Sequence, residues 1–460
     1  YGGPEALRYL HSLDIIDHDN VGMVGHSMGG SAITSAAFRY PDDYKAMFVV
    51  GSSSPIMDKD VDPTALKNFA YICGIEDKCR FDPSAVAPIF GKEDLKSIEA
   101  EKISGSFEDG TARALYYVPY PHATQISTQG PLRHIIDFIQ QAIPAPNPIS
   151  PSNQVWMWRY IGSMIAMAGF VFFFLPLGAI LLRTPFFKSV AQPIPEFKGL
   201  TGKSWWIGAI LTVLILAGSL FIFVVLTQKL IPSSTFWFMG RPKRIMGWAV
   251  LTSLVTIILI LVNHYVLKGD RNATAHNYGL TSQDGKVEWR NIGKSLLLAF
   301  SLFGIGYYVL VLVYRLLLVD FSVFEVAFRL LTPTRSRIVL QYLIPWMFAY
   351  IVLGANLHGL MRPKDGTKSL GREILVNILL LAPWFLLWFP LYFGSFYAGG
   401  TGLFASGERI EDWIWSFPSM LTIVAAISTY FYHKTGRVYV GAFLNAILVA
   451  WSLVAGNMFA

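Results

Sequence analysis

The chain has 460 residues, of which 53% are hydrophobic and only 15% are charged, with a net charge of +7. Ordinary soluble domains are about 25% charged, so much of this protein is expected to face lipid. The two cysteines exclude a disulfide-rich scaffold and an all-cysteine zinc site, which needs four ligands. The basic residues of the second half lie in short loops between apolar segments, which argues against a nucleic-acid partner.

The sequence divides into three parts. Residues 1–142 mix charged residues with short apolar strands, and residues 155–460 contain one long apolar segment after another. Between them, residues 143–154 repeat proline, which cannot donate a backbone hydrogen bond, so this stretch predicts a stiff extended linker.

A serine in a glycine-rich turn is the first candidate functional residue. A predicted strand at 21–24 leads to Ser27, which has Gly25 and Gly29 two residues to either side, and small residues at 31–37 predict a helix. Glycines give a strained turn room, and such a turn would raise the serine hydroxyl above the sheet edge. The backbone amide of Met28 would then stabilise an oxyanion. The alternative is a glycine- and serine-rich helix start that binds an anion.

An acid and a histidine follow the serine in the order that a catalytic triad requires. Asp77 follows a predicted strand at 69–72, and His122 follows another at 114–118, before a predicted helix at 131–142. The alternative for Asp77 is a solvated turn aspartate, with Glu76 and Asp82 as the other acids. The remaining histidines of this part are expected at the surface or in packing positions: His11, His18, His26 and His134.

Residues 1–142 resemble the C-terminal part of the α/β-hydrolase superfamily of lipases, esterases and serine peptidases. The resemblance rests on the order Ser27, Asp77, His122, on the turn Gly74-x-x-Asp77, and on the helix after His122. It implies an α/β fold and an acyl-enzyme mechanism. The family has several strands before the nucleophile, so we expect a partial hydrolase sheet, truncated at its N-terminus and lacking the second oxyanion donor.

The remainder predicts an all-α polytopic membrane domain, because about 20 apolar residues suffice to cross a bilayer. Eight segments approach this length: 155–182, 205–226, 245–267, 296–318, 338–360, 374–397, 415–432 and 438–458.

The connecting loops predict an orientation. Loops after the first, third, fifth and seventh spans carry more Lys and Arg than the others, so they are expected in the cytoplasm. The first domain would then lie outside the cytoplasm of an integral protein of the plasma membrane. There, Cys73 and Cys79 would form a disulfide, the alternative being two free buried thiols.

The spans contain few ionisable residues. His264, Arg315 and His358 are expected near an interface, so no ion or proton site is predicted. The asparagines of the spans are expected to form hydrogen bonds between helices: Asn263, Asn356 and Asn377.

The sequence therefore predicts a membrane-anchored serine hydrolase that cleaves an ester or amide, with a lipophilic substrate favoured by its location. No metal or organic cofactor is implied. Two alternatives remain: a membrane transport or scaffold protein with a non-catalytic hydrolase-like module, and an acyltransferase that uses the same triad.

Overall fold

The computed structural model describes residues 2–52, 62–75, 77, 86–232, 236–269, 272–323, 326–364, 369–398 and 411–457. The chain forms two compact units. The first unit contains Tyr1–Met157 and Pro390–Glu411, and the second contains Trp158–Phe389 and Asp412–Ala460. The main boundary lies just beyond the predicted linker. The boundary between Phe389 and Pro390 falls inside one apolar helical segment, Leu370–Gly394, most of which belongs to the second unit.

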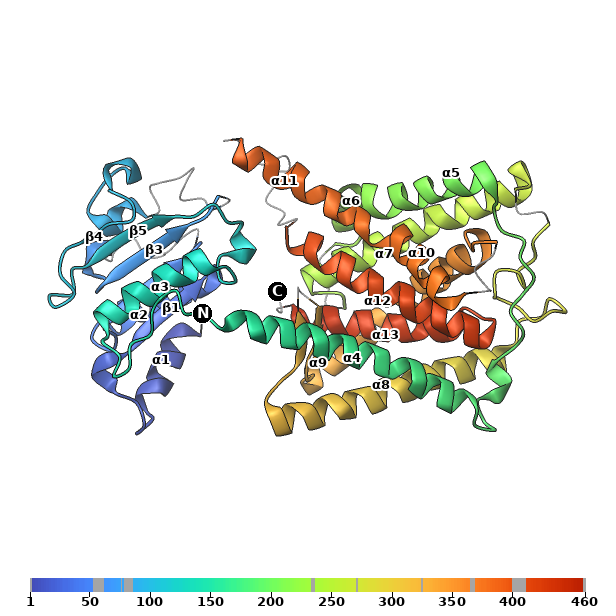
Figure 1. Cartoon of the computed structure of the whole chain (residues 1–460), viewed down its shortest axis with the longest axis horizontal. Helices are drawn as coiled ribbons and strands as arrows, with labels where there is room; N and C mark the ends of the chain where they lie inside the picture. The colour runs from blue at the N-terminus through green and yellow to red at the C-terminus, as the bar shows by residue number, and fades with distance from the viewer. Residues whose placement is uncertain are drawn as a thin grey trace. The chain divides into compact units, whose positions relative to one another are not determined.

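The first unit is built on a five-stranded sheet of order β1-β2-β3-β5-β4, with three α-helices (Figure 1). The first four of these strands pair in parallel, and β4 pairs antiparallel with β5. The strands are β1 (Gly22–His26), β2 (Ala46–Val50), β3 (Phe69–Cys73), β4 (Ile103–Ser104) and β5 (Arg113–Tyr117), and the helices are α1 (Gly3–His11), α2 (Met28–Arg39) and α3 (Gln129–Ala142). The predicted strands and helices of this part correspond to these elements within a few residues.

Both faces of the sheet are covered. Along β2, Met47 and Val49 pack in a core with residues of α1 and α2, whereas Phe48 and Val50 pack on the opposite face with Phe138 of α3. Every residue of β2 and of β3 is buried, as is usual for central parallel strands with helices on both sides. This arrangement holds the carboxyl ends of the parallel strands at one edge of the sheet.

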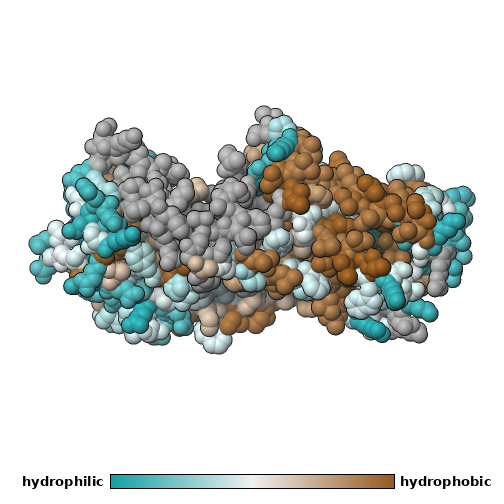
Figure 2. Space-filling model, turned by 90° about the horizontal axis from the view of Figure 1, so that it is seen from above, coloured by the Kyte–Doolittle hydropathy of each residue, from teal (hydrophilic) through white to brown (hydrophobic). Residues whose placement is uncertain are grey.

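The second unit is a helical bundle with a largely hydrophobic surface in the view of Figure 2. Its helices are α4 (Trp156–Leu182), α5 (Gly202–Val213), α6 (Leu220–Leu230), α7 (Gly240–Leu261), α8 (Trp289–Leu317), α9 (Pro333–Ala355), α10 (Leu370–Leu381), α11 (Trp388–Tyr397), α12 (Glu411–Thr435) and α13 (Tyr439–Gly456). It also contains a short hairpin of β6 (Phe321–Val323) and β7 (Val326–Phe328). α13 is the central helix, since it packs against α8, α9 and β7 and 83% of its apolar stretch is buried.

Among the described residues, six helical segments are long and apolar enough to cross a membrane, or seven if one bent pair forms a single span. The bent pair, Gly202–Gly218 and Ile222–Leu230, corresponds to the predicted span 205–226. The helix axis bends by 57° between the two halves. The predicted span 415–432 lies in α12, which is not among the six in the described part of the chain. The structure thus supports an integral membrane protein, and the eighth span stays a prediction.

The second unit contains a buried cluster of charged and polar residues that sequence spacing did not indicate. Glu373 and His358 are fully buried, with His358 Nδ1 3.3 Å from one oxygen of Glu373 and His433 Nε2 2.7 Å from the other. Nearby, Arg362 donates to the hydroxyl of Tyr432 (2.7 Å), whose ring stacks on His358. Partners that lie on different helices could not be paired from sequence spacing.

We expect Phe48→Ala to lower the free energy of unfolding of the first unit by about 3–5 kcal/mol, because it removes a fully buried ring that packs against Tyr116 and Phe138. Pulse proteolysis of the full chain in increasing urea would measure the change. Ile15→Ala, at a position 89% exposed, is the control. Equal midpoints for both variants would contradict the described core.

Candidate active site

Ser27 lies in a sharp turn between β1 and α2. Its backbone has φ 56° and ψ −122°, a region that residues other than glycine rarely occupy. Two hydrogen bonds hold the turn: the Ser27 amide donates to the carbonyl of Val50 (2.9 Å), and the Gly30 amide donates to the carbonyl of Ser27 (2.9 Å). Met28 is the first residue of α2, so its amide belongs to the helix end where backbone donors have no intrahelical acceptor.

Close packing explains two of the glycines around Ser27. A Cβ at Gly25 would lie 2.3 Å from the carbonyl oxygen of Gly29, and one at Gly30 would lie 2.5 Å from the Cβ of Ser52. The expectation that Gly29 prevents a clash is wrong, because a Cβ there would meet no described atom within 4 Å. The second close approach is made one residue later, where α2 packs on the end of β2.

Asp77 and His122 form a buried hydrogen-bonded pair. Nδ1 of His122 lies 2.8 Å from Oδ1 of Asp77, and the two residues are only 6% and 4% exposed. Their loops run side by side beyond the sheet, since the Val118 amide donates to the carbonyl of Cys73 and the Ile75 amide donates to the carbonyl of Tyr120. Because a carboxylate only accepts, Nδ1 carries the proton and Nε2 is left as the basic nitrogen.

Three donors hold the Asp77 carboxylate in its charged form. Burial by itself would raise the pKa of Asp77, but the hydrogen bond and charge of His122 outweigh it, together with donors from Gly74 and Gln125. The Gly74 amide and Gln125 Nε2 both reach Oδ2, at 2.5 and 2.9 Å. The net result is a pKa below the ordinary range, so Asp77 stays ionised at neutral pH.

Gly51 links the serine turn to this pair. It follows Val50, the residue that accepts from the Ser27 amide, and it has a left-handed φ of 54°. A Cβ at Gly51 would lie 3.0 Å from His122 Nδ1 and 3.1 Å from Asp77 Oδ1. The backbone at the end of β2 therefore packs directly against the Asp77–His122 pair on one side and holds the Ser27 turn on the other. Ser27, His122 and Asp77 thus lie at the same edge of the sheet.

Sequence reasoning missed three residues that support this site: Gly51, Gln125 and His26. Gln125 is fully buried, and His26 donates from Nε2 to the carbonyl of His122 (2.9 Å) with the two rings 4.5 Å apart. His26 was expected to have only a surface or packing role. The position of His26 next to Ser27 in the sequence could have indicated a role at this site. Nothing in the sequence around Gln125 indicates such a role.

The other histidines of the described first unit have partners away from this edge. His11 donates to the carbonyl of Asp43, His18 contacts the carbonyl of Leu13, and His134 stacks on Tyr116. These placements agree with the packing roles predicted for them.

Some predicted residues lie outside the described part of the chain: Glu76, Cys79 and Asp82. Cys73 is described, at the end of β3, and it is disulfide-bonded. The sequence holds one other cysteine, Cys79.

Acid should weaken the first unit through Asp77. Because the pKa of Asp77 is lowered in the folded state, its contribution to stability is present above the unfolded pKa of about 3.9 and is lost as pH falls through the folded value. At pH 6 we expect the wild-type chain to unfold at a higher urea concentration than Asp77→Asn. Below about pH 4 we expect the difference between the two urea midpoints to become smaller. A gap that is independent of pH, measured by pulse proteolysis, would refute this assignment.

Comparisons with family models, with curated proteins and with solved structures found no match for this chain.

Proposed function

We propose that this chain is a membrane-anchored serine hydrolase of the α/β-hydrolase type, with Ser27, His122 and Asp77 as its triad. One observation carries the proposal: the buried hydrogen bond between Asp77 and His122 lies at the strand edge that also holds the strained Ser27 turn. Strained, non-glycine backbone that the surrounding structure holds in place is found most often at functional sites.

The proposed reaction has two steps. Ser27 Oγ attacks the carbonyl carbon of an ester or amide while His122 Nε2 accepts the hydroxyl proton. The tetrahedral intermediate collapses when His122 returns that proton to the leaving alcohol or amine, which leaves an acyl group on Ser27. Water then attacks the acyl carbon, with His122 again accepting and returning a proton, and the acid is released.

The supporting residues have separate roles in this scheme. Asp77 holds the His122 ring in one orientation and stabilises the imidazolium that forms in each step. Gln125 and His26 are positioning residues, because they contact Asp77 and the His122 backbone rather than the reacting atoms. The Met28 amide supports the oxyanion, aided by the N-terminus of α2.

The membrane setting favours a lipophilic substrate or one presented at a membrane surface. An acyltransferase would use the same residues with another acceptor in place of water, so product analysis with competing alcohols separates these two outcomes.

We also propose that the first unit lies outside the cytoplasm, at the plasma membrane. Support comes from the Lys and Arg of alternate loops and from the bonded Cys73, because disulfides persist in oxidising compartments.

Labelling by a fluorophosphonate tests the hydrolase. The Ser27 oxygen would displace fluoride from phosphorus only if it is activated, so we expect the wild-type chain to be labelled and Ser27→Ala to lose labelling by at least about 100-fold, the scale of general base catalysis. Ser35→Ala, in the helix α2 that follows Ser27, is the matched control and should be labelled to the same extent as the wild-type chain. Absence of labelling, or labelling unchanged in Ser27→Ala, favours a non-catalytic module in a transport or scaffold protein.

Accessibility in intact cells tests the orientation. A membrane-impermeant maleimide should label Ser12→Cys, an exposed position of the first unit, and should label Lys364→Cys only after the cells are opened. Lys364 is the matched position, since it is exposed in a loop predicted to be cytoplasmic. The reverse pattern would place the first unit in the cytoplasm.

A further inference from the structure

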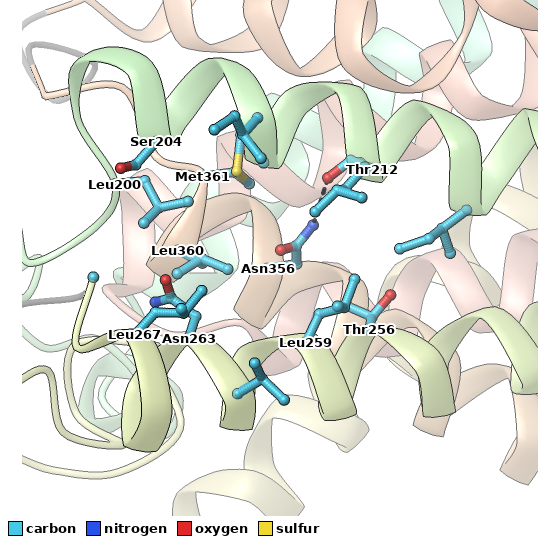
Figure 3. A pocket seen from close by; sticks show the side chains of 16 residues that line it. Leu200, Ser204, Thr212, Thr256, Leu259, Asn263, Leu267, Asn356, Leu360 and Met361 are labelled. Carbon is cyan, nitrogen blue, oxygen red and sulfur yellow. Dashed lines mark hydrogen bonds between the residues drawn. The ribbon is translucent and has the colours of Figure 1, made fainter.

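The second unit contains a cavity of about 310 Å³ between α5, α7 and the segments that follow α7 and α9. This volume is at the lower end of the range for small-molecule sites, about 300–1,000 Å³. Figure 3 shows the side chains of the 16 residues that line it, which come from helices far apart in the sequence. All of them belong to the second unit, so the cavity is separate from the residues of the candidate active site.

Three π-helical segments contribute to this one cavity. They are η9 (Leu214–Gly218), η10 (Val262–Leu267) and η11 (Asn356–Leu360), and they supply Ile215, Asn263 and Asn356 among other lining residues. π-Helices form well under 1% of residues in proteins and are frequently found at functional sites. Three of them around one cavity are therefore a strong indication of a binding site.

The wall formed by η11 is rigid, because its residues are held from both sides. On the cavity side, the Leu200 amide donates to the carbonyl of Leu360 (2.9 Å), and Trp205 Nε1 donates to the carbonyl of Met361 (3.0 Å). His358, in the same segment, belongs to the buried cluster with Glu373. The cavity is thus largely formed before any ligand binds, which lowers the entropic cost of binding.

The lining is uncharged and mostly apolar. None of its 16 residues is ionisable, and two of them, Ile207 and Leu267, are also 59% and 69% exposed on the outer surface of candidate membrane-spanning segments. A ligand would therefore enter from the bilayer, and a hydrocarbon chain would suit the walls.

Two asparagine side chains contribute polar groups to the cavity wall. Asn356 donates from Nδ2 to Thr212 Oγ1 (3.4 Å), and Figure 3 shows its amide oxygen turned away from Thr212. Asn263 is nine-tenths buried, and its Nδ2 has no hydrogen-bond partner among the described residues. The Asn263 amide is therefore an unsatisfied donor in the cavity wall, which suits a hydroxyl group as the acceptor.

We propose that this cavity binds an uncharged, single-chain lipid whose polar end is a hydroxyl group. The chain packs among the leucine, isoleucine and valine side chains, and the hydroxyl group accepts a hydrogen bond from Asn263. An anionic lipid is disfavoured, because burying a carboxylate beside no cation is costly.

Photo-crosslinking tests the proposal on the full chain in detergent micelles. The probe is a long-chain primary alcohol with a diazirine in its chain and a terminal alkyne, and it has no ester or amide bond that a hydrolase could cleave. We expect saturable crosslinks on peptides that contain the η10 and η11 residues, competed by the unlabelled alcohol. A fatty acid probe with the same chain, diazirine and alkyne should give at least about 5-fold fewer crosslinks than the alcohol probe at a pH where its carboxyl group is ionised.

Variants separate the cavity from the general lipid-facing surface. Leu259→Trp fills the cavity and should reduce the saturable crosslinks at least about 5-fold. Asn263→Leu should also reduce the crosslinks of the alcohol, because its hydroxyl group loses the Asn263 donor. Leu254→Trp, on the lipid-facing side of the same helix and 46% exposed, is the control and should label as wild type. Non-saturable crosslinks spread along exposed helices, or saturable ones unchanged in Leu259→Trp, would overturn the proposal.

Discussion

The parallel pairing of β1, β2, β3 and β5 is the constraint on which the candidate active site depends. It places the carboxyl ends of these strands at one edge, so the loops that carry Ser27, Asp77 and His122 come together although up to 95 residues separate them. The pairing is stable because β2 and β3 are buried on both faces, under α1 and α2 on one side and α3 on the other. A polar site at this edge therefore rests on a largely apolar support.

Close backbone approach is what brings the parts of the site into contact. Gly25 lets β1 pass against the start of α2, Gly30 lets α2 approach Ser52, and Gly51 lets the end of β2 approach the Asp77–His122 pair. A Cβ at Gly25 or Gly30 would lie within 2.5 Å of a neighbouring atom, and the left-handed φ of Gly51 disfavours any side chain there. Packing and chemistry are thus linked: the same short distances that exclude a Cβ hold the histidine and the carboxylate in place.

The second unit follows a different rule, since its helices must satisfy polar groups without water. Glu373 is acceptable in the core because His358 and His433 bind both of its oxygens, and Asn377 donates to Thr429 on a neighbouring helix. Each of the three π-helical segments contributes residues to the lining of the cavity. Together, η11 and the residues that follow it serve both features, with Asn356 at the cavity and His358 and Arg362 in the cluster.

The sequence by itself determined the local features: the strands and helices of the first unit, the apolar spans, and the order of Ser27, Asp77 and His122. Periodicity, turn residues and apolar length act over a few neighbouring residues, so they can be read along the chain. Only the tertiary structure decided which residues meet. Gln125 beside Asp77, Gly30 in place of Gly29 at the tight contact, Glu373 between two histidines and the cavity among three π-helical segments all depend on packing between distant segments, which no local pattern records.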